Sequence, residues 1–126
     1  MGELQVSLIL PTYNERENIS KLFEGIDDAL NGNWSYEMIV VDDNSPDGTA
    51  GAVRRLADRY PAVRLLERPH KAGLASAVAA GFSVAKGEYW VMMDADLSHR
   101  PDDLPRLLRG LSQFDIVIGS RYVEGG

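Results

Sequence analysis

The segment Asp94-Ala95-Asp96 places two carboxylates two residues apart, at the end of the apolar run EYWVMM. Residues two apart at a strand end point to the same side, so these carboxylates repel each other unless a cation lies between them. Mg²⁺ and Mn²⁺ bind one or two carboxylates together with phosphate oxygens. The pattern therefore indicates a metal site for a phosphorylated ligand. The simpler alternative is one aspartate capping the next helix and the other in solvent. A carboxylate pair for glycoside hydrolysis fits poorly, because it must face the sugar from two sides.

A second pair of carboxylates, Asp42 and Asp43, ends the apolar run YEMIVV. Successive strand residues alternate between the two faces of a sheet, so the two side chains cannot both face one ligand. We expect one to face a crevice and accept hydrogen bonds from a base or ribose. The other is expected to interact with helix N-termini or backbone amides. Asp47 is most simply a helix-start residue.

Basic residues near the predicted strand ends could bind phosphate. Arg121 could hold a diphosphate through two parallel hydrogen bonds, although a surface ion pair is an equal alternative. Arg68 and Lys71 are weaker phosphate candidates. His70 and His99 could be ligands or bases, but a lone histidine is more often a loop hydrogen-bonder, so neither is assigned a catalytic role. The sequence contains neither a GxGxxG fingerprint nor a P-loop lysine motif.

The elements that must position these residues follow from the hydrophobic pattern. Five apolar runs predict strands at 4–10, 36–41, 63–66, 88–93 and 114–119. Several runs are nearly continuous, which suits strands buried on both faces. Segments of helical period lie between them: the first has its apolar face from Ile19 to Leu30, and the others begin near residues 46, 72 and 101. The order βαβαβαβαβ predicts one α/β domain with a mainly parallel sheet and helices on both faces.

Local signals predict how the helices begin and which faces they bury. Asn14 with Glu17 matches a capping box for the first helix. Ser45 is the expected N-cap of the second helix, with Pro46 at its first position. The third helix is expected to turn an apolar stripe inward, formed by Leu74, Val78, Phe82 and Ala85.

Each predicted strand runs into a polar cluster, and these clusters read PTYNE, DDNSPD, ERPHK, DADLSH and SRY. Parallel strands bring all five clusters to one edge of the sheet, which is where open α/β sheets bind ligands. The sequence therefore predicts the site at this edge.

Composition narrows the class of partner. The chain has 126 residues, a net charge of -6 and no cysteine. The acidic balance argues against duplex nucleic acid, and the lack of cysteine excludes disulfides and thiolate chemistry. The N-terminus lacks the features of a signal peptide, and no apolar run approaches the ~20 residues of a membrane span. Because RYVEGG follows a strand-like segment without a docked terminal element, we expect the natural protein to continue.

Five segments occur in order: VSLILPTYNERENI, YEMIVVDDNSPDGT, KAGLASAVAAGF, YWVMMDADLSHRPDDLP and IVIGSRYVEGG. Together they resemble the family-2 glycosyltransferases of GT-A fold, and most of all the dolichol-phosphate (polyprenol-phosphate) mannosyltransferases. The match covers nearly the whole chain, and PTYNERENI and DDNSPDGT are its specific parts. The resemblance implies inverting transfer of mannose from GDP-mannose to a polyprenyl (dolichyl) phosphate, with Mg²⁺ or Mn²⁺ as cofactor.

The resemblance also implies roles for individual residues. The nucleotide-sugar would be bound by Pro11, Tyr13, Glu15, Val41, Asp43 and Asp94. The metal would be held by Asp94, Asp96 and Ser98. Some relatives have a glutamine at the position of Ser98, so serine would be a weaker ligand that acts through water. Asp96 would carry the catalytic role at the metal and donor diphosphate, and Arg121 would bind phosphate of the donor or acceptor.

The resemblance assigns residues 1–126 to the nucleotide-sugar-binding part of a GT-A domain. The acceptor-side region and any membrane helices or membrane partner would lie beyond Gly126. The expected location is cytoplasmic, at the cytoplasmic face of a membrane. An acceptor phosphate is already ionised near neutral pH, with a second pKa of about 6, and needs positioning more than a general base.

Three other functions are weighed against this one. A related family-2 enzyme could use a UDP-sugar such as UDP-glucose. A nucleotidyltransferase is disfavoured, because PTYNE stands where its glycine-rich basic loop would follow the first strand. A non-catalytic nucleotide-sugar-binding module is the third alternative.

Overall fold

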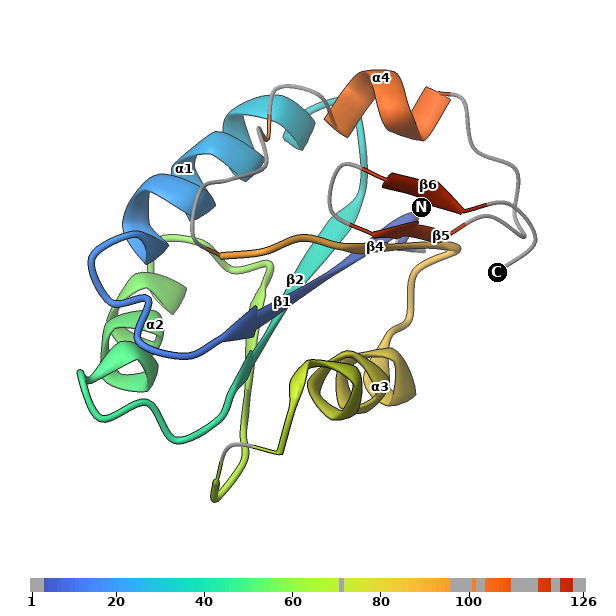
Figure 1. The fold of residues 1–126 in the computed structure, drawn as a ribbon. Helices are drawn as coiled ribbons and strands as arrows, with labels where there is room; N and C mark the ends of the chain where they lie inside the picture. Colours follow the sequence, from blue (N-terminus) through green and yellow to red (C-terminus); the bar gives the residue numbers. More distant parts are fainter. Residues whose placement is uncertain are drawn as a thin grey trace.

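The computed structural model describes residues 4–70, 72–95, 101, 104–109, 116–118 and 121–123. These residues form one twisted sheet with helices on both of its faces (Figure 1). The strands are β1 (Val6–Thr12), β2 (Tyr36–Asp42), β3 (Val63–Glu67), β4 (Tyr89–Met92), β5 (Ile116–Ile118) and β6 (Arg121–Val123). The helices are α1 (Ile19–Leu30), α2 (Thr49–Ala57), α3 (Leu74–Val84) and α4 (Leu104–Arg109). The predicted α/β class is confirmed.

The strand order in the sheet is β3-β2-β1-β4-β5-β6. The first five of these strands pair in parallel, and β6 runs antiparallel to β5. The apolar pattern predicted a last strand that ends at Gly119, and β6 was not predicted. Only two residues separate Ile118 from Arg121, which is the length of a tight hairpin connection. Arg121 therefore begins an added strand.

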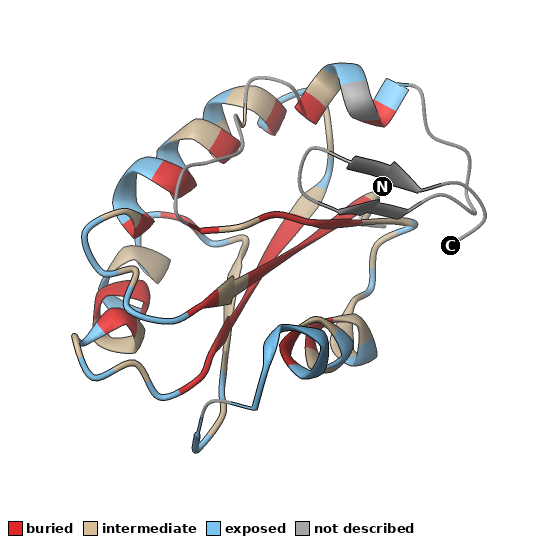
Figure 2. Cartoon of the chain, viewed as in Figure 1, coloured by how far each residue is buried: buried red, intermediate tan, exposed pale blue. Residues whose placement is uncertain are grey.

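Two apolar layers hold the helices to the sheet. α1, α2 and α4 pack on one face, where α1 buries the residues predicted from its spacing: Ile19, Leu22, Phe23, Ile26 and Leu30. α3 packs on the opposite face against β1 and β2. Figure 2 shows the buried residues concentrated along β1, β2 and β4, between these layers. The central strands are thus covered on both sides, as their nearly continuous apolar runs predicted.

The predicted inward stripe of α3 is correct only in part, because Phe82 and Ala85 are partly buried and pack against the sheet, whereas Leu74 does not. The residues of α3 that lie buried against the sheet are Ala77 and Gly81, while Leu74 is 55% exposed. A Cβ atom at Gly81 would lie 2.5 Å from Cγ2 of Ile9, so the helix approaches β1 more closely than any larger residue would allow. The larger side chains of α3 line an apolar groove of about 430 Å³ beside β4, formed by Leu74, Ala75, Val78, Ala79, Phe82 and Met92.

A buried polar network joins the amino-terminal ends of β1 and β2 to the segment after α3. Glu37 accepts hydrogen bonds from the Ser7 hydroxyl at 2.6 Å, the backbone N–H of Lys86 at 2.8 Å and the Arg64 guanidinium at 2.7 Å. Gly87 donates its N–H to the Ser7 hydroxyl. Burial opposes ionisation of Glu37, but these hydrogen bonds outweigh it and lower its pKa.

None of the helices within the described ranges is long and apolar enough to cross a membrane.

Candidate functional site

The carboxyl ends of β1 and β2 separate the two adjacent aspartates, as strand alternation predicted. Asp42 shares a face with Met38 and Val40 and points toward the layer that contains α1 and α2. Asp43 points to the other side, where α3 begins. Both side chains are buried, with 1% and 6% relative exposure. Each therefore needs hydrogen-bond partners of its own.

Asp42 is satisfied within the protein. Its carboxylate accepts hydrogen bonds from the Thr12 hydroxyl at 2.7 Å, the Ser45 hydroxyl at 2.6 Å and the Ser45 backbone N–H at 3.0 Å. Asp42 thus holds the end of β1 and the loop after β2 together. This is the structural role that the sequence left to one of the two aspartates.

Hydrogen bonds between two loops explain why both predicted helix starts are wrong. Asn14 has a positive φ of 59° and donates its backbone N–H to Ser45 Oγ at 2.9 Å, so neither residue caps a helix. α1 begins only at Ile19, and α2 only at Thr49 after Gly48. Asp47 fulfils its predicted role at a helix start, because its Oδ1 accepts the backbone N–H of Thr49 at 3.0 Å.

The same loops are held together on their outer side. The backbone N–H of Arg16 donates to Asp47 Oδ2 at 3.1 Å, and the backbone N–H of Glu15 donates to Thr49 Oγ1 at 3.0 Å. Desolvation opposes ionisation of Asp47, but the hydrogen bonds from Thr49 and Arg16 lower its pKa overall. The loop that carries Tyr13 is consequently fixed against the loop that carries Asp43.

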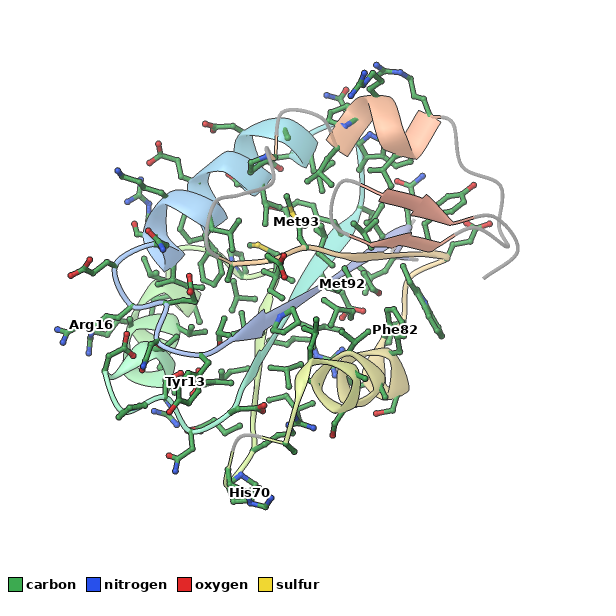
Figure 3. All side chains as sticks on the ribbon, viewed as in Figure 1. Tyr13, Arg16, His70, Phe82, Met92 and Met93 are labelled. Carbon is green, nitrogen blue, oxygen red and sulfur yellow. The ribbon has the colours of Figure 1, made fainter. Side chains whose placement is uncertain are left out.

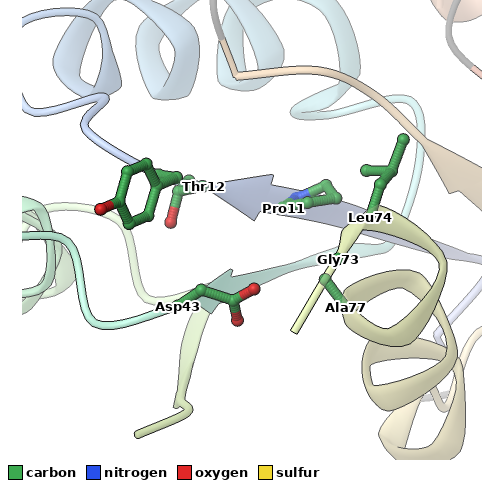
Figure 4. A pocket seen from close by; sticks show the side chains of 7 residues that line it. Pro11, Thr12, Asp43, Gly73, Leu74 and Ala77 are labelled. Carbon is green, nitrogen blue, oxygen red and sulfur yellow. The ribbon is translucent and has the colours of Figure 1, made fainter. Parts of the chain in front are cut away.

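A pocket of about 150 Å³ lies at this edge of the sheet, between the end of β1 and the start of α3 (Figure 4). It is lined by Pro11, Thr12, Tyr13, Asp43, Gly73, Leu74 and Ala77. Ligand pockets for whole small molecules usually exceed about 300 Å³. This pocket therefore has room for only part of a ligand of nucleotide size.

The pocket brings together three of the residues predicted to bind the nucleotide. Pro11 and Asp43 lie on its walls, and Tyr13 lies at its rim with 39% exposure (Figures 3 and 4). Glu15 does not line it; its carboxylate accepts a hydrogen bond from Asn18 Nδ2 at 3.2 Å. Val41 is fully buried behind the pocket, against α3.

Arg68, which the sequence offered only as a weaker phosphate candidate, pairs instead with Asp43. Its Nε and Nη2 donate to the two carboxylate oxygens of Asp43 at 2.6 and 2.8 Å, and its Nη1 donates to Ser76 Oγ at 2.6 Å. Its guanidinium is therefore engaged, unlike that of a free phosphate-binding arginine. The pKa of Asp43 is lowered, chiefly by this hydrogen bonding from Arg68.

Asp94 is the one proposed metal ligand within the described residues. It is partly exposed and follows β4, whose register pairs Ile9 with Met92. The Met93 backbone N–H donates to the Ile9 carbonyl at 3.1 Å, which continues this pairing and brings Asp94 beside Pro11. Asp94 thus lies at the same edge as the pocket.

The other predicted ligands, Asp96 and Ser98, lie outside the described residues. For Arg121 the structure describes the backbone in β6 and not the side chain. Within the described ranges, no group of three or more histidine, aspartate or glutamate side chains could hold a metal ion.

His70, the remaining basic candidate within the described residues, does not line the pocket. His70 is exposed, at the tip of the loop between β3 and α3 (Figure 3). Lys71 and His99 lie outside the described residues.

Comparison with known proteins gives consistent results. A dolichol-phosphate mannosyltransferase from Pyrococcus furiosus is 50% identical over 124 residues, which are 98% of this chain and 35% of that protein. An undecaprenyl-phosphate mannosyltransferase from Micrococcus luteus is 43% identical over 126 residues, covering 98% of this chain and 51% of that protein. The chain thus spans about a third to a half of the length of these relatives.

A solved structure supports the fold assignment. The mannosyltransferase from Pyrobaculum calidifontis, in complex with GDP-Man and Mn²⁺, is 34% identical, with a TM-score of 0.70 over 80% of this chain and 30% of that one. The GT-A fold implied by the sequence resemblance is confirmed by this similarity. The family model described as Glycosyl transferase family 2 matches residues 7–126. Because that match extends over nearly the whole sequence, the chain belongs to glycosyl transferase family 2.

Proposed function

We propose that this chain is the donor-binding part of an inverting, metal-dependent enzyme that transfers mannose from GDP-mannose to a polyprenyl phosphate. The observation that carries the proposal is the 50% identity to a dolichol-phosphate mannosyltransferase over 98% of the chain. The 34% identity to a mannosyltransferase solved with GDP-Man and Mn²⁺ supports the same donor and the same kind of cofactor.

The pocket at the end of β1 is the proposed place of the nucleotide base. Pro11 and Tyr13 supply flat apolar surface, and Asp43 supplies a buried acceptor for an N–H group of the ligand. Glu15 and Val41 act behind this wall in the proposal. Val41 fills the space beneath the pocket, and Glu15 belongs to the loop that is fixed against Thr49.

The diphosphate and its metal are proposed to lie further along the same edge. Asp94 offers a hard oxygen ligand next to Pro11, which suits Mg²⁺ or Mn²⁺, and we assign Asp96 and Ser98 as the further ligands. The bound metal supplies Lewis-acid neutralisation of the departing nucleoside diphosphate. Arg121 is proposed to bind phosphate of the donor or the acceptor through its guanidinium.

The acceptor chemistry requires little from this part of the protein. A lipid phosphate is itself an ionised nucleophile at neutral pH, so the enzyme must chiefly orient it toward the sugar. We propose that residues 1–126 form the donor half of the domain. The acceptor half would belong to further sequence of the kind that its longer relatives contain, at the cytoplasmic face of a membrane.

Isothermal titration of the 126-residue chain tests the donor and the metal together. We expect GDP to bind more tightly than UDP, and only in the presence of Mn²⁺ or Mg²⁺. Asp94→Asn and Asp96→Ala should abolish this metal-dependent binding of GDP. Asp28→Asn, which neutralises an exposed carboxylate on α1, should leave it unchanged.

Two results would change the assignment. Tighter binding of UDP than of GDP would replace the mannosyl donor by a UDP-sugar. Unchanged GDP affinity in Asp96→Ala would remove this residue from the metal site.

A further inference from the structure

The pairing of Arg68 with Asp43 follows from the register of two neighbouring strands. β2 and β3 pair Asp42 with Glu67, and the Arg68 backbone N–H donates to the Asp42 carbonyl at 2.8 Å. The next residues, Asp43 and Arg68, are therefore side by side on the face that α3 covers. Their side chains are only 7% and 16% exposed, so solvent screens this pair less than a surface ion pair.

The guanidinium of Arg68 joins three elements at the pocket. Two of its nitrogens contact both oxygens of Asp43, and the third contacts Ser76 in the first turn of α3. A planar guanidinium that donates to both oxygens of a carboxylate fixes the plane of that carboxylate as well as its charge. The Asp43 carboxylate is thus held in one orientation toward the pocket (Figure 4).

A carboxylate held in this way remains a pure hydrogen-bond acceptor. It has about four lone-pair positions; Arg68 uses one on each oxygen and the backbone N–H of Ala72 uses a third, so one acceptor position is left for a ligand. An ionised carboxylate accepts the ring N–H of guanine or uracil. It repels the ring-nitrogen lone pair that adenine and cytosine present at the corresponding position.

We propose that Arg68 is a positioning residue that orients Asp43 as an acceptor and so selects nucleotides whose base carries a ring N–H. This inference rests on the proposed function, because it takes the pocket to be the base site. Arg68 acts through Asp43 and need not touch the ligand. The lowered pKa of Asp43 agrees with this role, since protonation would turn the acceptor into a donor.

Two substitutions separate orientation from charge. Arg68→Lys keeps a cation beside Asp43 but loses the planar, two-pronged contact. We expect it to lower GDP affinity about tenfold, as for the loss of one charge-assisted hydrogen bond, and to keep the preference for GDP over ADP. Arg68→Met loses both the cation and the two-pronged contact, so the ratio of GDP affinity to ADP affinity should fall as well as the GDP affinity itself.

The measurement is titration with GDP, ADP, UDP and CDP in the presence of Mn²⁺. The matched control is Arg54→Met. Arg54 lies on α2 and forms an exposed ion pair with Glu67, the residue of β3 that precedes Arg68. This control should leave every ratio unchanged. The ratios report on base recognition, so a variant that merely loses stability would not alter them, and urea denaturation checks that each variant is folded.

The possible outcomes distinguish this inference from the proposed function. If the wild-type chain prefers UDP to GDP, the proposed GDP-mannose donor is wrong. In that case, a smaller ratio of UDP affinity to CDP affinity in Arg68→Met would still support the positioning role of Arg68. A wild-type chain that prefers GDP, with GDP affinity and ratios unchanged in both Arg68 variants, overturns the inference alone. A wild-type chain that binds none of the four nucleotides overturns both. If Arg68→Met does not fold, unchanged GDP affinity in Arg68→Lys is sufficient to reject the inference.

Discussion

Replacing Gly81 by alanine should leave the protein less stable than replacing Gly51 by alanine. A Cβ at Gly81 in α3 would lie 2.5 Å from Cγ2 of Ile9 and 3.2 Å from its Cδ1. A Cβ at Gly51 in α2 would meet only the end of the Arg55 side chain, at the ordinary contact distance of 3.6 Å. The two substitutions are chemically identical, and they differ in the space available.

The expected magnitudes follow from two opposing effects. Alanine is favoured over glycine inside a helix by roughly 1 kcal/mol, so Gly51→Ala should stabilise the protein by about that amount. Gly81→Ala gains the same term but forces α3 away from β1, and such overpacking costs roughly 1–3 kcal/mol. The difference between the two variants isolates the packing cost, because the helix-propensity term cancels.

Urea denaturation of both variants gives the two free energies of unfolding. GDP titration adds a second readout, because α3 carries Leu74 and Ala77 in the pocket wall. We expect Gly81→Ala to weaken GDP binding and Gly51→Ala to leave it unchanged. If Gly81→Ala stabilised the protein as much as Gly51→Ala, the close contact between α3 and β1 would be refuted.

Three further substitutions test other parts of the fold. Glu37→Gln should cost roughly 1.5–3 kcal/mol at pH 7, as for hydrogen bonds to a charged group. The folded state lowers the pKa of Glu37, so the stability that ionised Glu37 contributes is complete above the unfolded pKa of about 4.3 and is lost as pH falls through the folded pKa. Urea titrations at several pH values should therefore show the difference in unfolding free energy between wild type and Glu37→Gln becoming smaller over that range. Asp47→Ala removes the acceptor at the first turn of α2 and should cost about 0.5–2 kcal/mol in thermal unfolding, whereas an unaltered melting temperature would mean that the loop holds without it. Phe82→Leu removes a ring stacked on Trp90, with 4.9 Å between the ring centroids, and should lower the free energy of unfolding by about 0.5–1.5 kcal/mol. In a background with Trp34→Phe, the fluorescence emission of Trp90 should shift on this substitution. An unchanged spectrum would argue against the stacking.

The strands and the outer helices could be predicted from the sequence because their signals are local. The buried face of α1 was predicted from its apolar spacing, and β2 begins at Tyr36 as expected. The helix starts could not be predicted, because the side chain of Ser45 bonds to a different loop instead of to its own helix. The buried face of α3 was predicted only in part, because close packing against the sheet selected Ala77 and Gly81, which the apolar pattern of large residues does not mark.

The place of the pocket at the carboxyl ends of the strands was predicted as far as single motifs allow. Pro11, Tyr13 and Asp43 meet at one pocket because parallel strands bring their carboxyl ends together. The partnership of Asp43 with Arg68 depends on the register between β2 and β3, which no local pattern encodes. A useful signal was nevertheless present, since a buried acid at one strand end needs a cation, and Arg68 follows the neighbouring strand.

The position of β3 at the end of the sheet has a consequence for self-association. An end strand offers unpaired backbone groups that can recruit a strand from another molecule. β3 carries Arg64 and Glu67 among its five residues, and both are engaged in ion pairs with this chain's own side chains. A foreign strand laid against this border would have to disturb or bury those charges. Replacing both with apolar residues should therefore make the chain polymerise at concentrations at which the native sequence stays dispersed.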